Sequence, residues 1–289
     1  MLFDSHAHLN NDTFDSAERE ALAAEIEAHP IVSYIADIGF DLPSSVQAAL
    51  DSVKYDWCYA AVGVHPHDTR SMTEEILDAV KYLALEYGAS AIGEIGLDYH
   101  YMLSPKEDQR YWFRRQIRLA NELALPIVVH SREAAAETMD ILKEEGTFSD
   151  KRKAMFPERP APGGKTVPDA RVDIHCFSGS ADMALEYVSL GATIGICGPI
   201  TYKNNRKTIT VAEALPIEFM MVETDSPYMA PEPMRGRPNR SWYVEYTARK
   251  LAEIKGMSFE DAARATCENA LRFYGKKHRP LTLKSTGSR

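Results

Sequence analysis

The chain has 289 residues, 45% of them hydrophobic and 26% charged, which are the proportions of an ordinary soluble globular protein. Its formal net charge of −9 argues against a broad nucleic-acid-binding coat, which would need a basic face. No apolar run approaches the ~20 residues of a transmembrane helix, and the N-terminal residues lack the pattern of a secretory signal. Four cysteines without C-x-x-C spacing predict reduced core thiols, and with them a cytoplasmic protein without a membrane partner.

Short apolar, β-branched runs alternate with helix-like stretches along the chain. The expected strands are Leu2–Leu9, Ile31–Ile38, Cys58–Val64, Ala91–Leu97, Ile127–His130, Val172–Phe177, Ala192–Cys197 and Phe219–Thr224. The clearest helices are Ser16–Ala28, Ser44–Asp51, Thr73–Tyr87, Lys106–Leu123, Ala181–Leu190, Trp242–Lys255 and Ser258–Tyr274. Eight strands alternating with helices predict parallel pairing and closure into an α/β, TIM-type (β/α)8 barrel. An open doubly wound sheet is the alternative, but the first strand lacks a Gly-rich dinucleotide fingerprint.

Two segments interrupt this alternation. Residues 144–171 are rich in charge, proline and glycine, and we expect them to form a long loop excursion before the sixth strand, near the mouth of the barrel. Residues 276–289 have the composition of a disordered basic tail. The barrel is therefore expected to be one domain that spans residues 1–275.

Metal-capable side chains lie at the ends of the expected strands, where a TIM barrel places its active site. His6 and His8 share one face of the first strand because strand side chains alternate with period two. The full set at five strand ends is His6, His8, Glu94, His130, His175 and Asp225. Imidazole and carboxylate ligands suit Zn²⁺ or Mn²⁺, and a bridging carboxylate can hold two ions ~3.5–4 Å apart. This constellation predicts a hydrolytic metal centre.

Rival chemistries have weaker support. Cys176 neighbours His175, as a nucleophile pair would need, but adjacent strand residues point to opposite faces, so we expect Cys176 to face the helices. No serine occupies a G-x-S-x-G elbow, and no Walker loop is present.

Six motifs, in order along the chain, resemble the TatD-type family of metal-dependent deoxyribonucleases, a branch of the amidohydrolase-like barrels. They occupy residues 3–10 (FDSHAHLN), 63–67 (GVHPH), 93–99 (GEIGLDY), 126–132 (PIVVHSR), 175–179 (HCFSG) and 223–228 (ETDSPY). The resemblance covers nearly the whole chain. One departure is Arg240, which stands where the family usually has an acidic residue.

The resemblance implies two divalent ions, of Zn, Mn or Mg. His6, His8, Glu94 and Asp225 would hold one ion, and Glu94, His130 and His175 the other, with Glu94 as the bridge. The implied reaction is cleavage of DNA phosphodiester bonds, as by an exonuclease, through a metal-activated water. Glu94 and Asp225 are the catalytic candidates, with Asp225 as general base. Glu223 is expected either to orient a ligand histidine or to be a satisfied interior acid.

Basic and aromatic residues after the seventh and eighth strands predict a phosphate site, because these loops often bind phosphate in this fold. The substrate-binding candidates are His65, Tyr202, Lys203, Arg235 and Arg237. The expected partner is therefore DNA, with no obligate protein partner. The fold also permits another bond, in an amide, a lactone or the ester of D-aminoacyl-tRNA. A metal-dependent binding module is the non-enzymatic alternative.

Overall fold

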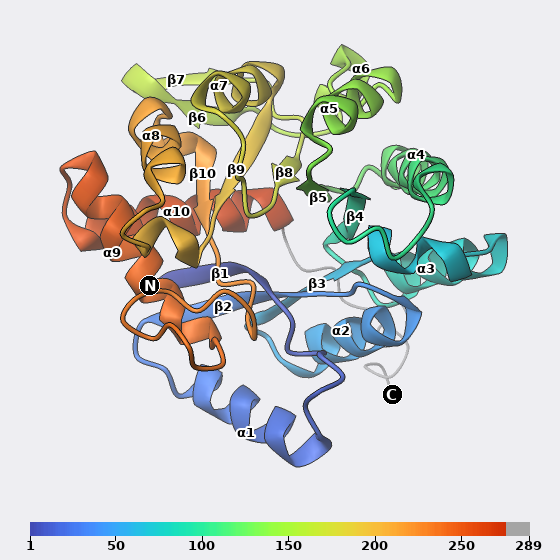
Figure 1. The fold of residues 1–289 in the computed structure, drawn as a ribbon, viewed down its shortest axis with the longest axis horizontal. Helices are drawn as coiled ribbons and strands as arrows, with labels where there is room; N and C mark the ends of the chain where they lie inside the picture. The colour runs from blue at the N-terminus through green and yellow to red at the C-terminus, as the bar shows by residue number, and fades with distance from the viewer. Residues whose placement is uncertain (276–289) are drawn as a thin grey trace, which may run out of the picture.

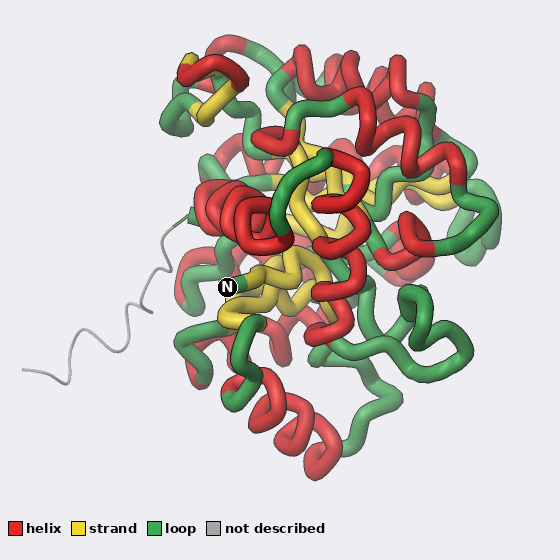
Figure 2. The backbone as a smooth tube through the Cα atoms, turned by 90° about the vertical axis from the view of Figure 1, so that its left-hand side faces the viewer, coloured by secondary structure: helices red, strands yellow, loops and turns green. Residues whose placement is uncertain are grey.

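The structure is a computed structural model that describes residues 1–275; the tail predicted at 276–289 lies outside the described residues. Eight parallel strands form one sheet in the order β1-β2-β3-β4-β5-β8-β9-β10. They are β1 (Leu2–Ala7), β2 (Val32–Ile38), β3 (Cys58–Val62), β4 (Ala91–Asp98), β5 (Ile127–Arg132), β8 (Val172–Ile174), β9 (Ala192–Ile196) and β10 (Met220–Val222). Helices surround these strands (Figures 1 and 2).

The helices are α1 (Ser16–Glu27), α2 (Leu42–Lys54), α3 (Glu74–Glu86), α4 (Lys106–Leu123), α5 (Ala135–Glu144), α6 (Asp150–Lys153), α7 (Ala181–Leu190), α8 (Arg206–Ala214), α9 (Val244–Lys255) and α10 (Phe259–Tyr274). Side-chain caps fix where several of them begin. The Asp41 carboxylate accepts from the Ser44 N–H while the Ser44 hydroxyl accepts from the Asp41 N–H, a reciprocal capping box. Thr73, Ser180 and Ser258 cap α3, α7 and α10. No helix within residues 1–275 is long and apolar enough to cross a membrane.

The first and last strands meet at a seam without a continuous ladder. One bridge joins Ala7 to Ser226. Beside it, the Asp225 N–H donates to the His6 carbonyl and the His8 N–H to the Ser226 carbonyl, both at 2.9 Å. The expected (β/α)8 barrel is therefore confirmed, and its seam runs through three of the predicted site residues.

Alternate residues of the strands pack into two different cores. Val129 and Val222 belong to the cluster between the strands and the surrounding helices. Their neighbours Val128 and Met221 belong to a second cluster, which also contains Tyr274 from α10. This second cluster contains side chains from strands at different positions around the barrel. It therefore fills the barrel interior. Helix α10 thus contributes side chains to the packed barrel interior beneath the site.

The segment expected as a loop near the mouth, residues 144–171, lies elsewhere. It follows α5 and contains α6 and an antiparallel hairpin, β6 (Arg159–Ala161) with β7 (Lys165–Val167). The buried Arg152 donates to the Ala170 and Leu125 carbonyls, both at 2.9 Å. These carbonyls precede β8 and β5, so the segment is fixed at the N-terminal ends of the strands. The expectation of a position near the mouth is wrong because a segment between a helix and the next strand returns to the opposite end of a (β/α)8 barrel.

Candidate metal centre

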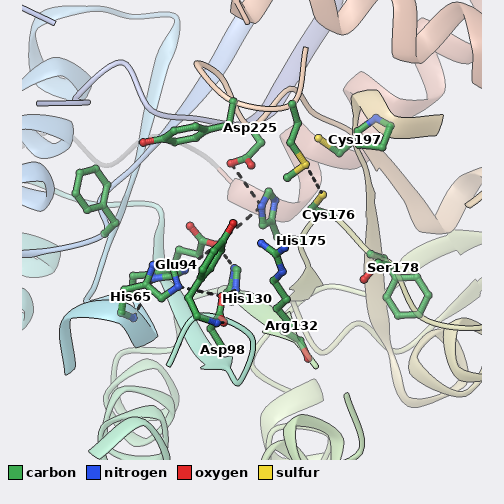
Figure 3. Close-up of a pocket in the computed structure, with 18 of the residues that line it drawn as sticks. His65, Glu94, Asp98, His130, Arg132, His175, Cys176, Ser178, Cys197 and Asp225 are labelled. Atoms are coloured by element: carbon green, nitrogen blue, oxygen red, sulfur yellow. Dashed lines mark hydrogen bonds and ion pairs between the residues drawn. The ribbon is translucent and has the colours of Figure 1, made fainter. Parts of the chain in front are cut away.

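A pocket of about 880 Å³ opens at the C-terminal ends of the strands. Five of the six predicted metal ligands line it, namely His8, Glu94, His130, His175 and Asp225. His6 lies deeper and is completely buried. Figure 3 shows Glu94, His130, His175 and Asp225 turned toward a common centre. The strand ends therefore bring the predicted set together.

One candidate ligand group consists of His6, His8 and Asp225, whose donor atoms lie within 4.8 Å of one another. Asp225 Oδ1 is 3.3 Å from His8 Nε2 and 3.9 Å from His6 Nε2. Glu94 Oε2 adds a fourth atom at 3.4 Å from His6 Nε2. Both ring nitrogens of His6 are buried without a hydrogen-bond partner, which is costly for a polar group. This group therefore fits a divalent ion, because coordination would satisfy a His6 nitrogen.

A second group brings His65 together with Glu94 and His130. Glu94 Oε1 lies 2.8 Å from His130 Nδ1 and 3.7 Å from His65 Nε2. His175 Nε2 is 3.9 Å from the same oxygen and 3.7 Å from Asp225 Oδ1, so it lies between the two groups. Glu94 thus stands where a bridging ligand would stand. His65, predicted as a substrate contact, belongs to a group that could hold a metal ion.

Glu223 occupies the position expected for an orienter of a ligand histidine. Its Oε1 lies 3.0 Å from His175 Nδ1 and accepts a hydrogen bond from the Cys176 N–H. Burial lowers the pKa of His175, but Glu223, with smaller contributions from Glu94 and Asp225, outweighs burial and raises that pKa well above its usual value. Gly195 makes room for this carboxylate, because a Cβ there would lie 2.6 Å from Glu223 Oε2. The absence of a side chain at Gly195 thus leaves the space that the Glu223 carboxylate occupies.

The carboxylates at the centre are ionised at neutral pH. Burial alone would raise the pKa of Glu94, but the imidazoles of His65, His6 and His130 together hold it well below its usual value. Burial likewise opposes ionisation of Asp225, and the hydrogen bond from His8 and the charge of His175 lower its pKa. Ionised carboxylates are the form that binds a divalent ion.

The pair His67 and Asp98 was not predicted as part of the site. Asp98 Oδ2 lies 3.0 Å from His67 Nε2 and 3.1 Å from His130 Nε2. These contacts overcome burial and lower the pKa of Asp98, while Asp98 and Glu94 raise the pKa of His130 to about 9 against the effect of burial. Asp98 ends β4 and lies four residues after Glu94 in the same motif. Because strand side chains alternate with period two, this even spacing was the sequence signal that could have placed Asp98 in the site.

Three basic residues predicted as substrate contacts, Lys203, Arg235 and Arg237, lie away from the pocket wall. Tyr202 donates its hydroxyl hydrogen to the Ala230 carbonyl, and Arg235 stacks on the Tyr202 ring with 4.5 Å between the guanidinium carbon and the ring centroid. Lys203, Arg235 and Arg237 are exposed. The cations that line the pocket are Arg132, at the end of β5, and Lys207, on α8.

Cys176 also differs from expectation. It lines the pocket instead of facing the helices. Strand β8 ends at Ile174, and Cys176 has a φ of 44°, in the left-handed region. The period-two argument therefore failed because regular strand geometry stops before this residue.

Comparison with known proteins identifies the family of this chain. The family model described as "TatD related DNase" matches residues 3–275. The chain belongs to the TatD family. An uncharacterised metal-dependent hydrolase, YabD of Bacillus subtilis, is 41% identical over 95% of this chain and 99% of its own length. The family resemblance noted in the sequence is thus confirmed.

Two further TatD relatives extend the comparison. A Pantoea ananatis protein named 3'-5' ssDNA/RNA exonuclease TatD is 29% identical over 95% of this chain and 99% of its own length. The crystal structure of YJJV, a TatD homologue from Escherichia coli K12, superposes with a TM-score of 0.78 at 26% identity, over 94% of this chain and 97% of that one. This TatD-family chain is therefore a metal-dependent hydrolase.

Proposed function

We propose that this TatD-family hydrolase is a deoxyribonuclease that cleaves phosphodiester bonds from an end of single-stranded DNA, with two divalent ions of Zn, Mn or Mg. The observation that carries the proposal is the position of Glu94. Its Oε2 faces His6 at 3.4 Å and its Oε1 faces His130 at 2.8 Å. One carboxylate thus joins two ligand groups at the floor of an open pocket, as bridged hydrolytic centres require.

His6, His8, Glu94 and Asp225 would hold one ion; Glu94 and His130, with His65 or His175, would hold the other. Such ions supply a nucleophile from water at neutral pH and a Lewis acid for the phosphoryl group. Asp225 lines the pocket with an ionised carboxylate and is the base that takes the proton from the attacking water. The same proton is then available for the leaving oxygen.

The remaining pocket wall suits a nucleotide strand. Arg132 and Lys207 supply positive charge at the wall, and arginine matches phosphate oxygens in a bidentate manner. Tyr101 and Tyr228 also line the pocket and are 54% and 53% exposed, so each ring offers a face on which a base can stack. A relative of this family carries the name of a 3'-5' ssDNA/RNA exonuclease, which agrees with this class of substrate.

The decisive experiment follows single-stranded DNA labelled at either the 3' or the 5' end, with Mg²⁺, Mn²⁺ or Zn²⁺. We expect stepwise shortening from one end, no cleavage of a circular single strand, and no activity in an Asp225→Asn variant that retains its fold. Hydrolysis of D-aminoacyl-tRNA is measured in parallel with the same preparations. Intact DNA under all three ions, together with deacylation of the tRNA, would show that the scaffold serves a different ester.

A further inference from the structure

Three sulfur atoms gather on one wall of the pocket, beside the candidate metal centre. Cys176 Sγ lies 3.8 Å from Met229 Sδ. Cys176 and Cys197 also form a group with Glu223 in which one potential ligand atom of each residue lies within 4.8 Å of the others. All three sulfur-bearing residues line the pocket, and Figure 3 shows Cys176 and Cys197 on the side of the cavity away from His65.

The carboxylate of this group, Glu223, has one oxygen without a hydrogen-bond partner. Glu223 is completely buried, and its Oε2 has no hydrogen-bond partner, whereas its Oε1 binds the Cys176 N–H and faces His175. An unpaired buried carboxylate oxygen is unfavourable unless a hydrogen bond or a cation satisfies it. This observation is independent of the sulfur atoms, and it points to a positive ligand between Glu223 and the two thiols.

We propose that Cys176, Cys197 and Glu223 form a site for one thiophilic metal ion, Cu⁺ or Zn²⁺, with Met229 as an additional thioether ligand. Thiolate and thioether sulfurs prefer these ions over Mg²⁺ or Mn²⁺, so the site differs in chemistry from the His and carboxylate centre. Each cysteine binds as a thiolate and releases its proton to solvent on coordination. Binding therefore involves no change of oxidation state.

The other two cysteines lie outside this group of sulfur atoms. Cys58 and Cys267 are completely buried, and Cys267 packs within the apolar cluster of α10 and the barrel interior. Neither lines the pocket. Only Cys176 and Cys197, among the cysteines of this chain, combine a pocket wall, a second sulfur atom and an acidic neighbour.

The shared Glu223 connects this site to the hydrolytic centre. Its carboxylate faces His175 through one oxygen and would face the thiophilic ion through the other. An ion on Oε2 draws negative charge away from the contact with His175 Nδ1. Occupancy is therefore expected to weaken the orientation of His175 and to lower hydrolysis, which makes the site inhibitory.

Co²⁺ provides a spectroscopic test with the purified full-length protein, because thiolate ligation produces near-ultraviolet charge-transfer absorption that nitrogen and oxygen ligands do not. We expect this absorption to appear as Co²⁺ is added and to reach saturation. Cys197→Ser should abolish it and Met229→Leu should weaken it, whereas Cys267→Ser should retain it. Circular dichroism establishes that each variant is folded.

Affinity for Cu⁺ is measured by competition with a chromophoric chelator. Loss of the Cys197 thiol should weaken binding by more than about 100-fold, beyond the effect of losing a mere outer-shell contact, while Cys267→Ser binds as the parent chain does. The proposal is overturned if the parent protein shows no thiolate–cobalt band and no competition for Cu⁺. It is equally overturned if folded Cys176→Ser and Cys197→Ser variants both keep the band.

Discussion

His175 Nδ1 lies 3.0 Å from Glu223 Oε1, although the two residues follow the ends of different strands, β8 and β10. The other ring nitrogen of His175, Nε2, faces Glu94 and Asp225 at 3.9 and 3.7 Å. Carboxylate partners of this kind fix the tautomer and orientation of metal-binding histidines. The relationship makes the contribution of Glu223 directly measurable.

Replacement of Glu223 by Gln should lower metal affinity by about 10–100-fold, because the neutral amide supports His175 less strongly. Gly195→Ala tests the same contact from the other side, since its Cβ would lie 2.6 Å from Glu223 Oε2. Metal stoichiometry after dialysis against a weak chelator provides the measurement. Both variants should retain less metal than the parent chain. Unchanged metal retention in both would show that Glu223 does not position His175.

Glu94→Ala should remove bridged metal and reduce hydrolysis by at least about 100-fold, while the barrel remains folded. The physical reason is that both oxygens of Glu94 face different ligand groups. Elemental analysis and the thermal midpoint are measured on the same sample. Glu94→Gln is the matched control for volume and should show the same loss of metal. Full ion stoichiometry in Glu94→Ala contradicts the bridge.

Arg132→Ala and Lys207→Ala should each raise KM for single-stranded DNA about tenfold, which corresponds to about 1.4 kcal/mol, because both cations line the pocket. The salt dependence of binding should become less steep, as expected when a phosphate contact is lost. Lys203→Ala and Arg235→Ala remove cations from outside the pocket wall and serve as controls. If Lys203→Ala and Arg235→Ala raised KM more than the two pocket variants did, the phosphate would bind at the loop residues predicted from the sequence.

Arg152→Met should destabilise the protein by about 3 kcal/mol, because it leaves buried backbone carbonyls without their donor. The Arg152 side chain is 1% exposed and donates to the Ala170 and Leu125 carbonyls. Lys151→Met, an exposed change on the same helix, should have little effect on denaturant midpoints. Activity per folded molecule should be unchanged in both, because the segment lies at the end of the barrel opposite the pocket.

Asp37 is expected to make stability depend on pH. Burial and the charge of Asp51 raise its pKa from 3.8 to about 8, against the hydrogen bond from the Asn10 N–H. Because the folded state favours the protonated acid, its contribution to stability is complete below pH 4 and is lost as the pH rises toward 8. Asp37→Asn should therefore gain stability relative to the parent chain over this interval.

The measurement is urea unfolding at pH values from 4 to 8, and the change in the difference between the two proteins is the decisive quantity. A constant offset reflects only the altered hydrogen bonding of the new amide. A difference that does not vary with pH would show that Asp37 keeps an ordinary pKa in the folded protein.

The sequence by itself determined the features that depend on local periodicity. Alternating apolar strands and amphipathic helices specify a (β/α)8 barrel because each element must bury one face. Barrel closure then brings strand ends together, so His6, Glu94 and Asp225 could be assigned to one site although they are far apart along the chain. The six-residue set was predicted at this level, and the structure brings its members together.

Tertiary structure alone decided what lies beyond the last regular strand residue. Cys176 turns into the pocket because its backbone is left-handed, and His65 approaches Glu94 from the loop after β3. The exposed Arg235 instead stacks on Tyr202. Residues 144–171 are anchored at the opposite end by Arg152. Loop directions follow from such long-range contacts, whereas periodicity describes only residues whose backbone geometry repeats.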